Sequence, residues 1–358
     1  MNAPIGNFDD KPWRSGHAVR IAVVLERYGN VMSPCSSIRL HAFTEQFPAD
    51  VRYMLAEELV GFTPSVIIWN RSALPSVEDV DRLVVLAREI GAKLIYDLDD
   101  NLLAMEDHPE RDAYIGLTAA VQRSITLADE VWCSTIALAE AVFDAGGKPL
   151  HMPNDLDPVL WEMDTPVRNE PDSGDPILRL VYMGTRTHDE DYRLLESALV
   201  LVEQARPGSF TLSLIGVNAS SAVEHDWVRT LSPPAHTGAA YPAFVRWFVR
   251  QGPFHLGLAP LVNTRFNRGK SAIKVLDYAA INVPTAASSV TGYLEDFDDD
   301  RLLIENTVEA WSDALIGVVD RRVDLSAICS RVIERVGSAP FEAAVARRWA
   351  RCVTGLRT

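Results

Sequence analysis

From Arg20 onward, short runs of apolar and β-branched residues alternate along the chain with longer amphipathic stretches. Such alternation is typical of βα units arranged around a parallel sheet. The apolar runs of the first half predict strands at residues 21–26, 51–55, 65–70, 92–97 and 130–134. The amphipathic stretches between them predict helices near residues 36–46, 77–90, 110–127 and 135–145.

A second series of the same kind begins after residues 167–176, where prolines, a glycine and acidic residues interrupt the apolar pattern as a linker does. The apolar runs beyond it predict strands at residues 178–183, 211–216, 255–260, 285–288 and 302–305. The amphipathic stretches predict helices near residues 188–205, 242–251, 271–281, 308–319, 322–336 and 341–354. We therefore expect a flexible N-terminus (residues 1–18), a first domain (residues 19–168) and a second domain (residues 169–337).

The predicted fold class is α/β, with two Rossmann-like doubly wound domains in tandem. When two such domains face each other, the carboxyl ends of both sheets surround one cleft. Open α/β sheets bind their ligands at that edge. We expect the function of the protein to lie in the cleft.

Composition and charge narrow the functional classes. The 358 residues include 49 Asp and Glu against 34 Lys and Arg, a net charge of -15 that disfavours binding to nucleic acid. The four cysteines lie far apart, which argues against a zinc site or a disulfide framework. The N-terminus is polar, and no apolar run approaches the ~18–20 residues that span a bilayer. We expect a cytoplasmic protein without a transmembrane segment, and peripheral contact with a membrane stays open.

The clearest candidate for ligand chemistry is the loop that opens into the helix predicted near residues 271–281. Free backbone N–H groups and the positive end of the helix dipole would face any anion placed there. Lys270 precedes this helix and Lys274 lies one turn on, so both reach a diphosphate, and Asp277 one further turn away suits the hydroxyls of a ribose. The alternative is a capped surface helix with a Lys–Asp pair. The candidate ligand-binding residues of this loop and helix are Asn267, Gly269, Lys270, Ser271, Ala272, Lys274 and Asp277.

A second candidate loop follows the strand predicted at residues 178–183. Gly184 would let the backbone approach a phosphate or a sugar closely, and Thr185 and Arg186 follow it. We interpret His188 as a helix-start residue rather than a general base. A glycine after a strand is common, so the alternative is an ordinary turn.

An acidic cluster follows the strand predicted at residues 92–97. Asp97, Asp99 and Asp100 repel one another unless a cation, hydroxyls or N–H donors relieve them. The cluster is open to three interpretations: a magnesium or manganese site, the nucleophile of a phosphohydrolase, or the cap of the next helix. In the first domain, Ser37 and Arg39 open the first helix, and an arginine in such a position is usually solvated or salt-bridged.

Several of these segments together resemble the retaining glycosyltransferases of family 4, which have the GT-B fold. The resemblance covers residues 20–320 and is carried by LAPL with FNRGKSAIKVLDYAAINVPTAAS (266–288), YDLDDNL (96–102), ADEVWCSTIALAEAV (128–142) with MPNDLDP (152–158), and VYMGTRTHDEDY (181–192). It implies a nucleotide sugar of the UDP or GDP type, held mainly by the second domain, and a hydroxyl acceptor held mainly by the first. In such an enzyme the loop before the first helix lines the cleft, so Ser37 and Arg39 could meet the acceptor or a donor phosphate. Asp99 and Asp100 would then lie beside the donor sugar or the acceptor, in an enzyme type that usually needs no metal and no further cofactor.

The family places a Glu-x7-Glu motif against the donor, and this chain departs from it. Asp277 stands at the second position, and Gly269 stands at the first. The resemblance implies a metal-independent hexosyltransferase of glycan, polysaccharide or glycoconjugate biosynthesis. Two other functions remain open: a sugar-nucleotide or glycan-binding protein without catalysis, suggested by Gly269, and a phosphohydrolase built on Asp97 and Asp99.

The last predicted helix carries an apolar stripe that needs a partner surface, made by Phe341, Val345, Trp349, Cys352 and Val353. In GT-B proteins the last helix commonly crosses back to the N-terminal domain. The resemblance therefore implies that residues 338–358 pack on the first domain.

Overall fold

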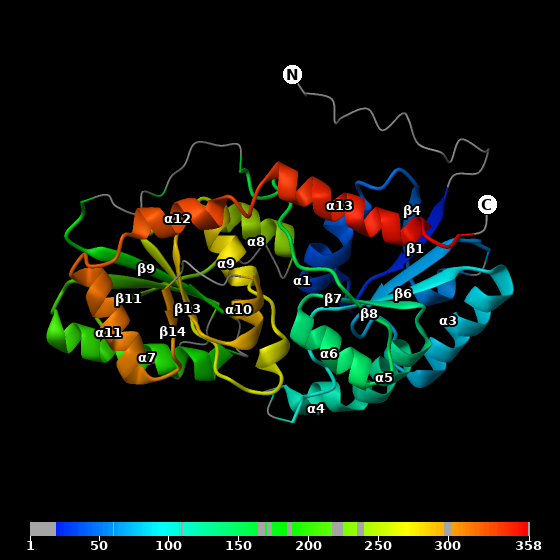
Figure 1. Ribbon diagram of the computed structural model, residues 1–358, viewed down its shortest axis with the longest axis horizontal. Coiled ribbons are helices and arrows are strands. Elements are labelled where there is room, and N and C mark those ends of the chain that lie inside the picture. Colours follow the sequence, from blue (N-terminus) through cyan, green and yellow to red (C-terminus); the bar gives the residue numbers. More distant parts are fainter. Residues whose placement is uncertain are drawn as a thin grey trace, which may run out of the picture.

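A computed structural model describes residues 19–59, 61–106, 108, 110–163, 169, 174–184, 188–216, 225–234, 240–296 and 302–356. The expected flexible N-terminus and most of the expected linker lie outside these residues. The described chain forms two six-stranded parallel sheets and one short hairpin. The two sheets lie at opposite ends of an elongated molecule (Figure 1).

The first sheet has the strand order β4-β1-β5-β6-β7-β8, with a crossover on each side of β1. Its strands are β1 (Arg20–Val24), β4 (Asp50–Met54), β5 (Val66–Asn70), β6 (Lys93–Leu98), β7 (Glu130–Cys133) and β8 (Pro149–His151). The hairpin pairs β2 (Arg27–Tyr28) with β3 (Val31–Met32). The central strands are buried and largely apolar because both faces of the sheet are covered.

Helices on both faces enclose this sheet. They are α1 (Pro34–Ser36), α2 (Ala42–Thr44), α3 (Val77–Ile90), α4 (Arg111–Tyr114), α5 (Thr118–Leu127) and α6 (Ile136–Asp144). In α3, Ser76 caps the first turn and Gly91 ends the helix at a φ of 72°, while residues 80, 83, 84 and 87 form its buried stripe. A single helix is expected over residues 36–46, but a π-helical turn η1 (Ser37–His41) separates α1 from α2.

The second sheet repeats the arrangement with the order β11-β10-β9-β12-β13-β14. Its strands are β9 (Leu178–Met183), β10 (Phe210–Ile215), β11 (Val228–Leu231), β12 (Leu256–Ala259), β13 (Thr285–Ser288) and β14 (Leu302–Ile304). The helices are α7 (Asp189–Ala205), α8 (Tyr241–Phe248), α9 (Ile273–Ala280), α10 (Thr291–Asp296), α11 (Val308–Val319) and α12 (Leu325–Ile333). One face of the sheet packs on α7 and α11, and the other packs on α8, α9 and α12.

The C-terminal helix α13 (Ser338–Val353) leaves the second half and runs along the first (Figure 1). Phe341 stacks on Phe43 with ring centroids 5.1 Å apart, and Trp349 lies 5.5 Å from Phe47. Arg351 forms an ion pair with Glu130, the first residue of β7. The apolar stripe of this helix is therefore buried against residues before 165.

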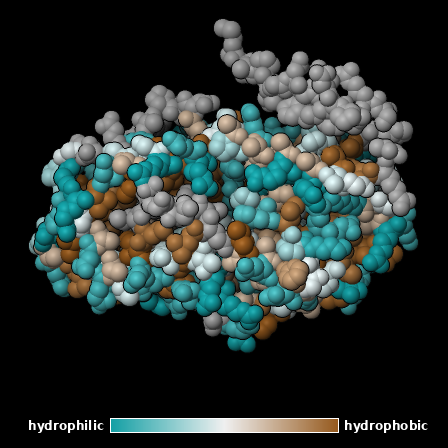
Figure 2. All heavy atoms as spheres, viewed as in Figure 1, coloured by the Kyte–Doolittle hydropathy of each residue, from teal (hydrophilic) through white to brown (hydrophobic). Residues whose placement is uncertain are grey.

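Figure 2 shows mainly hydrophilic residues along the outline of the molecule. On the face shown, hydrophobic residues gather toward the middle of the second half. Among the described residues, no helix combines the length and the apolar character that a membrane crossing requires.

Candidate functional site

A cavity of about 700 Å³ lies between the two halves. Its walls in the first half come from segments that follow β1, β5 and β6, and its walls in the second half come from the start of α7, the loop before α9, and α10. In both halves these segments follow the carboxyl ends of the strands or lie beside them. This is the edge at which open α/β sheets bind ligands.

An arginine holds together the acidic wall of this cavity. Arg71 follows β5 directly, and its guanidinium lies 3.1 Å from a carboxylate oxygen of Glu26 and 2.8 Å from one of Asp99. The same guanidinium also pairs with Asp100. One cation faces three carboxylates, so this wall keeps a net negative charge toward the cavity.

Arg71 is also in an unusual backbone conformation, with a φ of 46°. A non-glycine residue in the left-handed region is disfavoured, and such residues cluster at functional sites. Cys35, Asp99 and Asp100 bring possible metal ligands within 4.8 Å of one another. Arg71 already pairs with one oxygen of each aspartate, so the protein itself balances part of their negative charge.

The opposite wall is basic and includes Lys270, Ser271 and Lys274. Burial lowers the pKa of Lys274 to about 8. Its Nζ is buried without a hydrogen-bond partner among the described residues, and it lies 5.4 Å from the centroid of the Tyr182 ring. Buried ammonium groups normally have hydrogen-bond partners, so this unpaired one is available to an anionic ligand.

Asp277 lies one turn along α9 from Lys274, behind the cavity wall. Burial raises the pKa of its carboxyl group to about 8, and Lys274 opposes this rise. Its Oδ1 has no hydrogen-bond partner within the described part of the chain. α9 therefore carries a buried donor group, the Lys274 ammonium, and a buried acceptor, Asp277 Oδ1, neither of which has a hydrogen-bond partner among the described residues.

The loop between β12 and α9 is held from both halves of the molecule. From its own half, Asn267 donates its side-chain amide to the carbonyl of Val262 at 2.9 Å. From the first half, the Thr135 hydroxyl donates to the Gly269 carbonyl at 3.0 Å, and Asn154 donates to the Ser271 hydroxyl at 2.7 Å. The loop is thus fixed in place before any ligand binds.

Two glycines let this loop pack so closely. A Cβ at Gly292 in α10 would lie 2.0 Å from the Lys270 carbonyl oxygen, and a Cβ at Gly269 would lie 3.2 Å from the Cβ of Asn101. A larger residue at either position would have to move the loop or its neighbour. The glycine at position 269 thus has a packing reason.

Two histidines line the cavity as well. The Nδ1 of His188 lies 2.6 Å from Asp191 Oδ2, and burial followed by Lys274 holds the pKa of His188 well below its ordinary value. His108 packs on Phe266 with ring centroids 4.4 Å apart, and burial followed by Lys270 lowers its pKa. Both rings are therefore neutral near pH 7.

The structure brings together only part of the predicted site. Asp99, Asp100, Lys270, Ser271 and Lys274 line the cavity. Asn267, Gly269, Ala272 and Asp277 are buried behind its wall. Gly184 directly follows β9 and does not line the cavity. Thr185 and Arg186 lie outside the described residues.

The residues expected to meet an acceptor are placed differently. Ser37 and Arg39 are buried, and neither lines the cavity. Both Arg39 and Asp97 are fully enclosed and form a bidentate ion pair at 2.7 and 3.1 Å. Burial disfavours the charged guanidinium of Arg39, but the carboxylate of Asp97 outweighs this effect, so the pKa of Arg39 is raised. Asp97 is therefore a structural partner of Arg39 and is not accessible as a phosphohydrolase nucleophile, and Arg39 in turn donates to Asn154 at 3.0 Å.

Sequence reasoning missed Arg71 and Glu26. It interpreted His188 as a helix-start residue, and the structure confirms this, because His188 directly precedes α7. Glu26 lies two residues beyond the end of β1, and Arg71 directly follows β5. These two strands pair with each other in the middle of the sheet. The position of Glu26 and Arg71 after apolar strands is the same signal that singled out Asp99, and it identifies them once the strand order is known.

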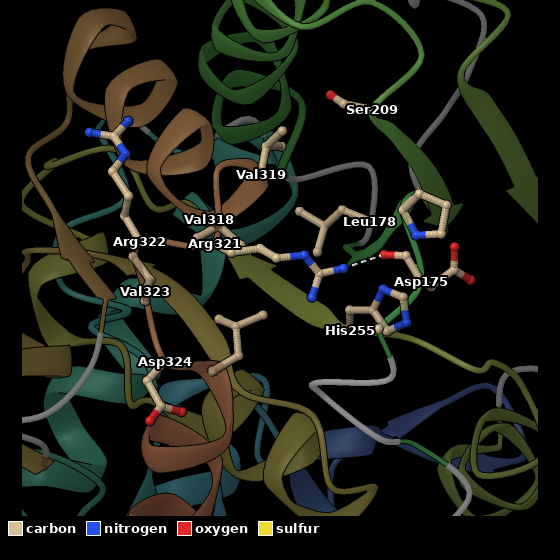
Figure 3. A pocket seen from close by; sticks show the side chains of 13 residues that line it. Asp175, Leu178, Ser209, His255, Val318, Val319, Arg321, Arg322, Val323 and Asp324 are labelled. Carbon is tan, nitrogen blue, oxygen red and sulfur yellow. Dashed lines mark hydrogen bonds between the residues drawn. The ribbon is translucent and has the colours of Figure 1, made fainter.

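A second hollow, of about 420 Å³, lies at the amino ends of β9, β10 and β12 (Figure 3). Leu178, Val318 and Val319 form an apolar wall, and Arg321 reaches across to donate to the backbone oxygen of Asp175 at 2.7 Å. It lies at the sheet edge opposite to the one that binds ligands in this fold class. The cavity between the halves is therefore the candidate site.

The fold matches solved structures of GT-B glycosyltransferases. HepE from Anabaena, in complex with UDP and glucose, has a TM-score of 0.64 at 12% identity, and the match covers 94% of this chain and 100% of HepE. TarM from S. aureus has a TM-score of 0.58 at 11% identity, over 84% of this chain and 58% of TarM. A UDP-forming trehalose-phosphate synthase from Burkholderia vietnamiensis has a TM-score of 0.58 at 13% identity, over 85% of this chain and 73% of the synthase.

No protein-family model matches the chain. A comparison with curated protein sequences finds no significant match either. At 11–13% identity the structural matches show the fold: the chain has the two-domain α/β architecture called GT-B.

Proposed function

We propose that this protein is a glycosyltransferase that moves a hexose from a nucleoside diphosphate donor to a hydroxyl acceptor, with retention of configuration. The observation that carries the proposal is the pairing of walls of opposite charge across one cavity, with Lys270 and Lys274 facing Asp99 and Asp100. Glycosyl transfer separates a departing diphosphate from a sugar that becomes cationic. Fixed groups of opposite sign on the two sides stabilise both parts of that transition state.

In this proposal the diphosphate binds Lys270, Ser271 and Lys274, and the ribose binds near Asp277. The structures of HepE with UDP and with UDP-glucose support a donor of the UDP type, with GDP as the alternative. The acceptor would be a hydroxyl of a glycan, a lipid or a protein glycan, which places the reaction in the synthesis of polysaccharides or glycoconjugates. Transfer would need no metal, because lysines and N–H groups balance the charge of the leaving diphosphate.

The deciding experiment measures the binding of UDP and GDP by calorimetry in the wild type and in a Lys270→Ala/Lys274→Ala double variant. Each lysine makes charge-assisted hydrogen bonds worth ~1.5–3 kcal/mol, so the double variant should bind at least about tenfold more weakly. Lys148→Ala is the matched control, because Lys148 is exposed and lies outside the cavity. Equal affinity of the folded double variant and the wild type would refute the proposed site.

Retention is tested on the product. Incubation with UDP-glucose and a panel of acceptor glycans should yield a product whose new linkage has the anomeric configuration of the donor, which NMR spectroscopy reads directly. A product of inverted configuration would contradict the mechanism while leaving the donor site intact.

A sugar-nucleotide-binding protein without catalysis is the second candidate. It is favoured by Gly269, whose packing against Asn101 leaves little room for an acidic side chain at the position of the family's first glutamate. Donor binding without transfer and without donor hydrolysis, across the same acceptor panel, would favour this candidate.

A further inference from the structure

His188 and Asp191 form a dyad at the edge of the cavity that the proposed diphosphate site does not use. His188 stands directly before α7, and Asp191 lies in the first turn of that helix. Asp191 is buried, with one oxygen accepting the N–H of Val262 at 2.6 Å and the other lying 2.6 Å from His188 Nδ1. The carboxyl group is therefore fixed by contacts from two different segments.

These contacts determine which nitrogen of His188 carries the proton. Burial raises the pKa of Asp191, and Lys274, the Val262 amide and Lys270 only partly oppose this rise. The assignment therefore rests on geometry: one oxygen accepts the Val262 N–H, as a carboxylate does, and the other oxygen faces His188 Nδ1. A carboxylate offers only lone pairs, so the Nδ1 of His188 donates to it. A neutral imidazole that donates through Nδ1 has a free lone pair on Nε2.

That lone pair is available to a ligand. His188 lines the cavity, and no described residue forms a hydrogen bond with its Nε2. Lys274, Lys270, Asp100 and His108 are the charged or titratable groups whose fields reach it across the cavity. An ionised phosphate also offers only lone pairs, so it is not the partner of Nε2. The partner must be an O–H or N–H group.

We propose that His188, oriented by Asp191, accepts a hydrogen bond through Nε2 from a hydroxyl group of the donor's sugar. This inference rests on the proposed function, because it assumes that the diphosphate of a nucleotide sugar occupies the neighbouring lysines. The sugar is the part of such a donor that follows the diphosphate and that carries several O–H groups. His188 thereby contributes to the choice of the sugar, and Asp191 acts on it as a positioning residue.

The test compares a diphosphate with its sugar ester, so that the phosphate contacts cancel. Calorimetry measures the Kd of UDP and UDP-glucose, and of GDP and GDP-mannose as a second pair, in the full-length protein. His188→Phe keeps a planar ring and removes both nitrogens, whereas His188→Gln keeps a side-chain acceptor. His225→Phe is the matched control, since His225 lies in the same half, stacks on Trp227 at 4.4 Å and does not line the cavity.

We expect His188→Phe to keep the Kd of the diphosphate within about twofold and to raise the Kd of the preferred nucleotide sugar at least about fivefold, which corresponds to about 1 kcal/mol. His188→Gln should recover part of the loss, Asp191→Asn should show a smaller loss of the same kind, and His225→Phe should behave like the wild type. Equal weakening of diphosphate and nucleotide sugar, or no change in either, would overturn the inference while leaving the proposed function standing. Failure of the wild type to bind any nucleotide sugar would refute the proposed function itself, and the inference with it.

Discussion

Lys274 should make nucleotide binding depend on pH in a calculable way. Burial lowers the pKa of its ammonium group to about 8, so the free protein loses this charge within an accessible pH range. A diphosphate binds the ammonium form, hence the affinity falls as the pH rises through 8. For a pKa of about 8, the protonated fraction decreases from about 0.9 at pH 7 to about 0.24 at pH 8.5. The apparent Kd of UDP should therefore rise about fourfold, or about 0.8 kcal/mol.

Other groups facing Lys274 bear on this slope. Asp191 and Asp277 stabilise its charge, whereas Lys270 opposes it. Burial raises the pKa of Asp277 to about 8, so its ionisation would add negative charge in the same pH range and would also weaken the binding of an anion. The variant that separates the two is Lys274→Arg, because a guanidinium stays protonated throughout.

The assay is calorimetric titration with UDP at pH 7.0, 7.5, 8.0 and 8.5, in buffers of different ionisation enthalpy. The wild type should take up a proton on binding above pH 8, and Lys274→Arg should show a flatter pH profile. A wild type whose affinity does not change with pH would refute the reasoning. A slope that persists unchanged in Lys274→Arg would assign the titration to Asp277 instead.

Three further predictions concern packing and metal dependence. Trp349→Ala should lower the free energy of unfolding by about 3–5 kcal/mol, because Trp349 is buried against Phe47; an unchanged midpoint in chemical denaturation would contradict this. Asp97→Ala should cost a similar ~3–5 kcal/mol by leaving the enclosed guanidinium of Arg39 unpaired, and a stable variant would show that the pair contributes nothing. Glycosyl transfer should continue in the presence of a chelator. If the chelator abolishes activity and magnesium or manganese restores it, the carboxylates of the acidic wall bind a metal ion.

The sequence predicts the repeated βα pattern well because both sheets are covered on two faces. Their strands are therefore largely apolar runs, and the boundaries predicted for β6 and β9 differ from those observed by at most one residue. The prediction is weakest at the sheet edges, where β8 and β11 are missed. They are only 3 and 4 residues long, and each pairs on one side only, so neither has a long apolar run.

The candidate site is predictable only where its chemistry is local. Lys270 and Lys274 can be predicted from the sequence because they lie within five residues of each other, where a loop leads directly into a helix. The ion pair between Arg39 and Asp97 cannot be found in that way, since its members are separated by 58 positions and meet only when η1 packs on the carboxyl end of β6. An arginine in an early helix is ordinarily exposed, and no local pattern distinguishes this one as fully enclosed.

The same enclosed pair connects the two halves of the molecule at the proposed diphosphate site. Arg39 donates to Asn154, and Asn154 donates to the hydroxyl of Ser271 in the loop before α9. Thr135, also in the first half, binds the Gly269 carbonyl two residues earlier. The loop that presents Lys270 is therefore shaped by side chains of the other half. A movement of one half against the other would change the position of this lysine, so the affinity for a diphosphate and the closure of the cleft are expected to be coupled.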